Sequence, residues 1–314
     1  MNETAAALRR RGVTDVDDSA LARAMYSTDA SLYRVPPSVV VRPRHVEEIL
    51  ASLEVARETS VPLTMRGAGT SIAGNAVGPG IVVDTSRYLH RVLQLDVERR
   101  TALVEPGTVH ATLQQQALRH GLRFGPDPST HSRCTIGGMI GNNACGSRAL
   151  GYGRTVDNVV TLDVVTGAGE RLVLGDGADA GDAGRALAAL VDGSLSTVRT
   201  ELGRFGRQVS GYSLEHLLPE HGRRVDRFLV GSEGTLAVVL SATVALVEDA
   251  PHRALAVLGY PTMAEAADAV PGLLTHPLVA CEGLDERIVE VVRERRGPSA
   301  VPALPRGGGW LFAE

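Results

Sequence analysis

The chain has 314 residues, of which 44% are hydrophobic and 22% are charged, as is ordinary for a globular protein of one or two domains. Its formal net charge is −4, without the excess of basic residues that binding to nucleic acid requires, so we expect no nucleic-acid partner. All 32 basic residues are arginine, which excludes a Schiff-base lysine and a phosphate loop that ends in Gly-Lys-Ser/Thr.

Residues 1–35 are predicted to form a helical extension of one or two short helices, which the prolines at 36 and 37 end. A buried strand at 39–41, a helix at 45–59 and a strand at 61–65 then make a β-α-β unit. The second of these strands leads into the segment RGAGTSIAGN at 66–75. Crevices at the carboxyl ends of such strands commonly bind ligands.

The remaining elements follow from hydrophobic periodicity and turn residues. We predict strands at 81–84, 91–96, 101–105, 227–230 and 236–247, a hairpin over 159–174, a helix at 109–120 and a partly helical stretch at 178–203. After a change of composition at 248–251, we predict strands at 253–259, 278–283 and 310–313, with helices at 262–274 and 285–296. Because the last strand starts and breaks off, we expect a second domain that is cut short and leaves Trp310 and Phe312 uncovered.

The cysteines and histidines predict no metal or cluster site within the chain. Cys134, Cys145 and Cys281 lie too far apart for a CxxC motif, and the nine histidines show neither HxH nor HxxxH spacing. A sparse and odd cysteine count fits a reducing compartment. The first residues lack the apolar run of a signal peptide, and no stretch of about 20 apolar residues exists to span a membrane.

Two segments, 66–75 and GPDPSTHSRCTIGGMIGNNACGS at 125–147, are rich in glycine and almost free of bulky side chains. Glycine lets the backbone approach a ligand closely, and consecutive N–H groups form a concavity that binds anions. One such segment alone is as compatible with a surface loop as with a binding loop. Two of them in one chain indicate a ligand with phosphates and a large flat body.

Three ordered blocks, RGAGTSIAG, then PDPST with TIGG and NNACGS, then GSEGTLAVV, resemble the FAD-binding domain shared by vanillyl-alcohol oxidase, D-lactate dehydrogenase, glycolate oxidase subunits and D-2-hydroxyglutarate dehydrogenase. The resemblance is strong over residues 26–250. Residues 26–43, YSTDASLYRVPPSVVVRP, are similar to a bacterial subgroup in which a cap and a C-terminal iron–sulfur portion follow the flavin domain. The resemblance implies an α+β, two-subdomain FAD-binding PCMH-type fold at 36–249, and a truncated α/β cap domain at 250–314.

The resemblance also implies which residues bind FAD. The first block would wrap the pyrophosphate with Arg66, Gly67, Ala68, Gly69, Thr70, Ser71, Gly74 and Asn75. The second block would follow the flavin and ribityl chain with Pro126, Asp127, Ser129, Thr130, Thr135, Gly137, Gly138, Asn142, Asn143 and Gly146. The backbone of 135–138 and the two asparagines would offer amides to the isoalloxazine edge. Glu233, Gly234 and Thr235 would close the ring and Val238 would lie against the adenine, although Glu233 is equally consistent with a cap on a neighbouring loop.

Members of the family that tether FAD from the first loop carry a histidine where this chain has Thr70 or Ser71, so we expect non-covalent FAD. A bond to His131 or Cys134 is the less favoured alternative, because free cysteine usually behaves as a small apolar residue. Cys145 is interpreted as packing for the same reason. His131 is the only histidine in a glycine-rich loop and a weak candidate for a catalytic base; a surface role is favoured over it.

The resemblance implies an FAD-dependent dehydrogenase of a D-2-hydroxy acid such as D-lactate, glycolate or D-2-hydroxyglutarate, with hydride passing from the substrate α-carbon to flavin N5. The electron acceptor would be a quinone, an iron–sulfur portion or a subunit. The protein would then be either cytoplasmic or held peripherally at the inner membrane through that acceptor. Two alternatives stay open, an alditol or lactone oxidase that uses O₂ and an FAD-binding module without activity of its own.

Overall fold

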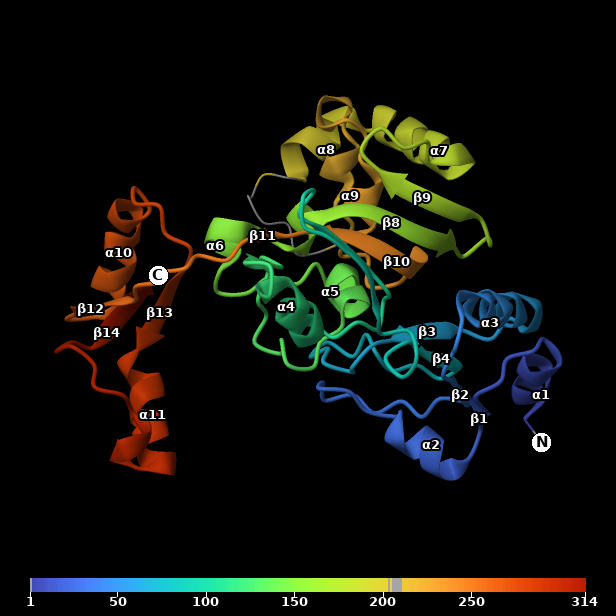
Figure 1. The fold of residues 1–314 in the computed structure, drawn as a ribbon, viewed down its shortest axis with the longest axis horizontal. Coiled ribbons are helices and arrows are strands. Elements are labelled where there is room, and N and C mark those ends of the chain that lie inside the picture. The colour runs from blue at the N-terminus through green and yellow to red at the C-terminus, as the bar shows by residue number, and fades with distance from the viewer. Residues whose placement is uncertain (1, 203, 205–210) are drawn as a thin grey trace.

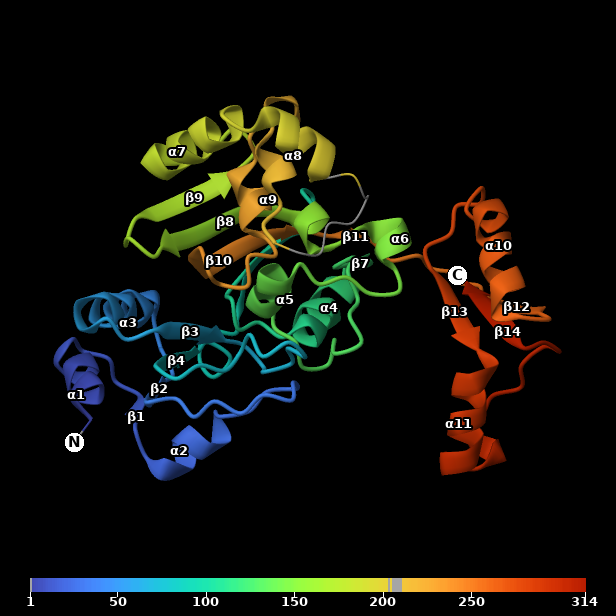
Figure 2. The ribbon, with the colours of Figure 1, turned by 180° about the vertical axis from the view of Figure 1, so that it is seen from behind.

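The computed structural model describes residues 2–202, 204 and 211–314 of the chain. Two sheets lie one above the other in the larger part of the molecule, and a third sheet with two helices stands at one end (Figure 1). The view from behind shows the same separation, with α6 beside the third sheet (Figure 2). No helix in the described ranges is both long and apolar enough to cross a membrane.

The first sheet has the strand order β1-β2-β4-β3. Its strands are β1 (Val16–Asp17), β2 (Val39–Val41), β4 (Ile81–Asp84) and β3 (Leu63–Arg66). The strands β2 and β3 each pair parallel with β4, and α3 (Val46–Thr59) connects them, so the predicted β-α-β unit is confirmed. Buried parallel strands read as continuous apolar runs, as Val39–Val41 does.

The predicted N-terminal helices are also confirmed, as α1 (Glu3–Arg10) and α2 (Ala20–Met25). Ala5 and Leu8 of α1 pack into the same apolar core as α3, and β1 pairs with β2. Residues 1–35 are therefore joined to the first sheet through both strand pairing and core packing.

The second sheet is antiparallel throughout, with the order β5-β6-β10-β8-β9. Its strands are β5 (Val92–Asp96), β6 (Thr101–Val104), β8 (Val159–Thr166), β9 (Arg171–Gly175) and β10 (Ala237–Ala245). The predicted hairpin β8–β9 is confirmed, and the predicted strands β5 and β6 also pair as a hairpin. Their turns contain Arg100 and Gly169, both with positive φ, which suits a tight connection between antiparallel strands.

Short helices surround this sheet. They are α4 (His110–Leu118), α5 (Ile136–Asn142), α6 (Ala149–Tyr152), η1 (Thr155–Asn158), α7 (Gly181–Asp192), α8 (Leu195–Glu201), η2 (Leu214–Leu217), η3 (Pro219–His221) and α9 (Val225–Leu229). The small pair β7 (Leu122–Arg123) and β11 (Val247–Glu248) closes the end near α6. The helical prediction for 178–203 is confirmed up to Glu201; residue 203 lies outside the described residues.

The strand predicted at 227–230 is wrong, because these residues belong largely to α9. A four-residue apolar run cannot separate a buried strand from a buried helical turn by periodicity. Here Phe228 packs with Val191, Val198 and Leu217 of neighbouring helical segments, and this cluster decides the helical turn.

Residues 250–314 form the third sheet, with the order β12-β14-β13. Its elements are β12 (Ala256–Tyr260), α10 (Met263–Leu273), β13 (Cys281–Asp285), α11 (Glu286–Arg296), η4 (Pro298–Ala300) and β14 (Gly309–Ala313). The strand β14 is central and is paired on both sides over its whole length. The expectation of an uncovered Trp310 is therefore wrong: its side chain is 6% exposed and its indole N–H donates to Pro305 O at 2.8 Å. Phe312 is half-buried.

Contacts join this third sheet to the larger part of the molecule. Gly151 N–H in α6 donates to Val279 O at 3.0 Å. The Arg148 guanidinium bridges two carboxylates, with Nη2 2.9 Å from Glu314 Oε1 and Nη1 3.2 Å from Asp127 Oδ2. Asp127 lies in the second glycine-rich segment, so that segment is tied to the end of β14.

Candidate cofactor site

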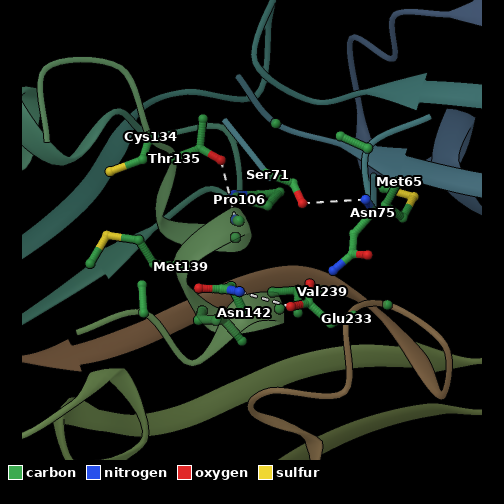
Figure 3. Close-up of a pocket in the computed structure, with 18 of the residues that line it drawn as sticks. Met65, Ser71, Asn75, Pro106, Cys134, Thr135, Met139, Asn142, Glu233 and Val239 are labelled. Atoms are coloured by element: carbon green, nitrogen blue, oxygen red, sulfur yellow. Dashed lines mark hydrogen bonds between the residues drawn. The ribbon is translucent and has the colours of Figure 1, made fainter. Parts of the chain in front are cut away.

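A cavity of about 230 Å³ lies where the loop after β3, helix α5 and the turn before β10 meet (Figure 3). Its wall contains these residues predicted to bind the cofactor: Arg66, Gly67, Ala68, Gly69, Thr70, Ser71, Asn75, Thr130, Thr135, Gly137, Gly138, Asn142, Glu233 and Gly234. Members of all three sequence blocks, which are far apart along the chain, thus line one cavity.

The loop at 67–71 presents backbone donors that the protein leaves unused. Within the described ranges, the N–H groups of Ala68, Gly69, Thr70 and Ser71 donate to no protein acceptor. Gly69 has φ +67, a conformation that glycine adopts without strain. The Ser71 hydroxyl accepts from the N–H groups of Ala73 at 3.2 Å and Asn75 at 3.3 Å, which fixes the end of the loop. Successive free N–H groups on such a loop suit a phosphate group.

Close contacts at two glycines, one in each glycine-rich segment, shape the wall of the cavity. A Cβ at Gly67 would lie 2.2 Å from Thr135 Oγ1, and one at Gly137 would lie 2.7 Å from Pro106 O. Both distances are shorter than any real contact of a side-chain carbon. The absence of a side chain at Gly67 therefore lets the loop after β3 lie against the start of α5. The absence of one at Gly137 lets α5 lie against Pro106, and these residues all line the cavity.

Arg66 contributes to the shape of the loop. Its Nη1 donates to Ala76 O at 2.9 Å and its Nη2 to Thr28 O at 3.0 Å. Its guanidinium also lies 5.2 Å from the centre of the Tyr26 ring. These contacts hold both ends of the loop together, a role that the sequence alone did not indicate.

The expectation that the backbone of 135–138 offers amides to the cofactor is wrong for residues 136–138. The N–H of Ile136 donates to Thr108 O and that of Gly137 to Pro106 O, both at 2.8 Å. The N–H of Gly138 donates to the Thr135 side chain at 3.2 Å, because Thr135 caps the N-terminus of α5. A threonine followed by apolar residues at 136, 139 and 140 is a helix-start pattern, and this signal was present in the sequence.

The third block closes the C-terminal end of α5. Glu233 N–H donates to Gly141 O at 2.9 Å, and the Glu233 carboxylate accepts from Asn142 Nδ2 at 2.8 Å (Figure 3). Asn143 has φ +50 and its side-chain oxygen accepts from Val156 N–H at 3.0 Å. Asn143 and Thr235 line a neighbouring cavity of about 380 Å³ and are not on the wall of the first.

Three other residues predicted to bind the cofactor, Gly74, Ser129 and Gly146, do not line the cavity. Gly74 packs against the ring of Tyr33, and Gly146 packs against the backbone of Asp127. Ser129 is exposed, while its neighbours Pro128 and Thr130 line the cavity.

Val238 needs a correction because it does not face the cavity. It is 6% exposed and packs into the core shared with β2 and α3. Successive residues of a strand point to opposite faces, so Ala237 and Val239 face the cavity instead. Sequence reasoning also missed the apolar side chains Met139, Leu162 and Val164 on this wall. The alternation of β8 and β10 was the available signal, but it does not say which face meets a ligand.

Pro126 is positioned by a buried histidine of α4. His110 is 1% exposed, and its Nε2 lies 2.8 Å from Pro126 O, so Nε2 carries the hydrogen and donates it. His110 Nδ1 has no partner within the described ranges. Burial is the main cause that lowers the pKa of His110 to about 4, so the ring is neutral at pH 7.

The two sequence candidates for reactive groups are placed differently. His131 is exposed, lies off the cavity wall, and has its ring centre 6.1 Å from that of His110. Cys134 lines the cavity at 5% exposure, and burial raises the pKa of its thiol. A protonated thiol is a weak nucleophile. The described residues contain no group of three or more His, Cys, Asp or Glu side chains that could hold a metal ion.

Comparison with known proteins agrees with this geometry. Residues 37–175 match the family model described as FAD binding domain. The chain is 31% identical to D-2-hydroxyglutarate dehydrogenase of Pseudomonas putida, over 85% of this chain and 28% of that protein. It is 35% identical to D-lactate dehydrogenase of Archaeoglobus fulgidus, over 81% of this chain and 48% of that protein. It is 31% identical to glycolate oxidase subunit GlcD of Bacillus subtilis, over 90% of this chain and 53% of that protein.

Among solved structures, an alkyldihydroxyacetonephosphate synthase matches with a TM-score of 0.68 at 19% identity, over 95% of this chain and 52% of that one. This likeness confirms the predicted mixed helix-and-sheet fold. The chain thus carries an FAD-binding domain of the PCMH type. Its cofactor is FAD, as the sequence predicted. The chain spans 28% to 53% of the length of the three relatives named above.

Proposed function

We propose that this chain provides the FAD-binding part of a dehydrogenase that oxidises a D-2-hydroxy acid such as D-lactate, glycolate or D-2-hydroxyglutarate. The observation that carries the proposal is one cavity whose wall contains both residues 68–71, with their unused N–H groups, and the start of α5. The names of the relatives support the substrate class, because they are dehydrogenases of 2-hydroxy acids and a glycolate oxidase subunit.

The residues of the cavity fit the parts of FAD. The N–H groups of Ala68 to Ser71 would bind the pyrophosphate, since backbone donors on a glycine-rich loop suit phosphate oxygens. The apolar side chains of Met139, Val164 and Val239 would exclude water from the flat ring systems. When bound, FAD supplies a two-electron acceptor for the oxidation of an alcohol carbon.

We also propose that FAD is held without a covalent bond. Thr70 and Ser71 stand on the first loop where a histidine would be needed, and the Cys134 thiol stays protonated because it is buried. Arg66, Cys134 and Glu233 are the ionisable side chains on the described wall, and each has a role other than proton abstraction: loop shape, packing and the bond to Asn142. The base that removes the hydroxyl proton is therefore assigned to none of them.

Residues 36–249 would form the FAD-binding domain, 1–35 its N-terminal extension and 250–314 the beginning of a cap domain. The electron acceptor would be a quinone, an iron–sulfur portion or a subunit. The protein would work in the cytoplasm or at the inner membrane through that acceptor.

Anaerobic mixing of each hydroxy acid with an FAD-loaded protein that has the full length of the relatives named above tests this function, because the present chain spans 28% to 53% of their length. We expect the absorption band of oxidised flavin to bleach with at least one D-2-hydroxy acid, and to remain with the L-enantiomers of lactate and 2-hydroxyglutarate. Bleaching by an alditol or lactone alone would contradict the substrate class. A flavin that none of these compounds reduces would contradict the dehydrogenase function.

A further inference from the structure

The segment at 26–33 lies against the outer side of the loop at 66–76, and we call it the brace. We propose that the brace positions this loop for FAD and so sets the affinity for the cofactor, although no brace residue lines the cavity. The inference rests on the proposed assignment of the loop to the FAD pyrophosphate. The brace lies outside the matched FAD binding domain, which begins at residue 37.

The brace contacts the loop near its start, middle and end. Thr28 O accepts from Arg66 Nη2 at 3.0 Å, and Ala30 N–H donates to Gly69 O at 3.0 Å. Asp29 Oδ2 accepts from Ala76 N–H at 3.3 Å. Farther along, the Tyr33 ring lies so close to Gly74 that a Cβ there would be 2.6 Å from Tyr33 Cδ2.

The bond from Ala30 to Gly69 has a direct consequence for the anion site. In a trans peptide the carbonyl oxygen and the N–H of the next residue point in opposite directions. When Gly69 O points outward to Ala30, the N–H of Thr70 points inward, and Thr70 lines the cavity. The brace therefore holds one of the unused donors toward the space in which the phosphate would bind. Donors that are already oriented bind a ligand at lower entropic cost.

The brace is itself anchored to the first sheet. Tyr26 OH donates to Asp84 Oδ2 at 2.7 Å, and Asp84 is the last residue of β4 and 6% exposed. Burial, and then the bond to Asp84, raise the pKa of Tyr26, so its hydroxyl remains a donor at neutral pH. The Tyr26 ring in turn lies beneath the Arg66 guanidinium. The loop is therefore connected through Tyr26 to the end of β4.

The test measures the dissociation constant for FAD of the variants Asp29→Ala and Tyr33→Ala by quenching of flavin fluorescence, together with the unfolding temperature of each apoprotein. We expect each variant to weaken FAD binding by about 10-fold, the size of one lost hydrogen bond or packing contact. Binding of ADP should weaken in parallel, and binding of riboflavin, which has no phosphate, should not change. Tyr33→Phe keeps the ring and should restore the affinity that Tyr33→Ala loses.

Asp18→Ala is the matched control, because Asp18 pairs with Arg9 in the same extension and follows β1, which is at the opposite edge of the first sheet from β3 and its loop. It should bind FAD as the wild type does. A lower unfolding temperature of the apoprotein with unchanged FAD affinity in both brace variants would overturn the proposal, because the brace would then be only structural. Tyr33 is 61% exposed, so Tyr33→Ala keeps the test valid if Asp29→Ala does not fold. Gly69→Ala separates the two ideas: if it weakens FAD binding and the brace variants do not, the loop assignment stands and the brace fails.

Discussion

Replacing Gly69 by alanine perturbs the proposed phosphate loop at its most constrained point. Gly69 has φ +67, and a Cβ there would lie 2.5 Å from Arg66 Nη2 and 2.9 Å from its Cζ. A flexible arginine would normally move aside, but this guanidinium is bonded to Thr28 O and Ala76 O. The substitution must therefore break these bonds or shift the loop.

The effect of backbone strain can be separated from the effect of the broken Arg66 hydrogen bond by a control substitution at a second glycine. Gly121, at the end of α4, has φ +68, and a Cβ there would meet nothing within 4 Å. Both alanine variants would lose about 1–2 kcal/mol of stability from the left-handed backbone. Only Gly69→Ala would also break a hydrogen bond from the charged Arg66 guanidinium, and a hydrogen bond of this kind contributes about 1.5–3 kcal/mol. If FAD binding becomes weaker by about 2 kcal/mol as a result, the dissociation constant for FAD rises roughly 30-fold.

The assay is titration of each apoprotein with FAD, followed by flavin fluorescence, with thermal unfolding measured in parallel. We expect Gly121→Ala to lower the unfolding temperature and to leave FAD affinity unchanged, and Gly69→Ala to lower both. Equal FAD affinities of Gly69→Ala and the wild type would refute the assignment of the loop to the cofactor phosphates.

Three further predictions follow from the structure. Heat or acid should release all of the flavin from the polypeptide, and flavin that stays with the denatured chain would contradict non-covalent binding. The pKa of His110 is about 4 in the folded protein and about 6.5 in the unfolded chain. Between about pH 6.5 and pH 4 the unfolded state therefore binds more protons than the folded state, so the free energy of unfolding falls as the pH drops through this range. Between about pH 7 and pH 5 the wild type should lose about 2 kcal/mol more of its free energy of unfolding than His110→Gln does. Equal losses in the wild type and in His110→Gln, measured by denaturant titration at both pH values, would contradict this prediction. Arg148→Met should lower the free energy of unfolding by about 1–3 kcal/mol, because it leaves the half-buried carboxylates of Asp127 and Glu314 without their charged partner. Arg185→Met removes an exposed pair and should change the free energy of unfolding by less than about 0.5 kcal/mol. Equal effects of the two substitutions in denaturant titrations would argue against the Arg148 bridge.

Elements with a strong and regular pattern could be predicted from the sequence. The strand Val39–Val41, the helix at 46–59 and the β8–β9 hairpin follow from local periodicity and turn residues, because neighbouring residues decide them. The run at 227–230 could not be assigned in this way, since packing of Phe228 with distant helices decides its conformation. The core position of Trp310 was missed for a related reason, because both partner strands of β14 precede it in the chain.

For the site, glycine content identified the two loops that meet at the cavity, because close approach of backbone requires glycine there. Which N–H groups remain free could not be read from the residue types. Thr135 uses the donor of Gly138 for a helix cap, whereas Ala68 to Ser71 keep theirs. The contacts of the brace could not be predicted from the sequence either, because Asp29 and Tyr33 become neighbours of the loop only through the pairing of β2, β4 and β3.

A crystal structure of the protein with FAD tests the central claim most directly. The account predicts one FAD in the cavity between the loop at 66–76 and α5, with the pyrophosphate oxygens within hydrogen-bonding distance of the N–H groups of Ala68 to Ser71. The Gly69 carbonyl should remain bonded to Ala30 in that complex. A pyrophosphate bound elsewhere, with these N–H groups facing only water, would contradict the account.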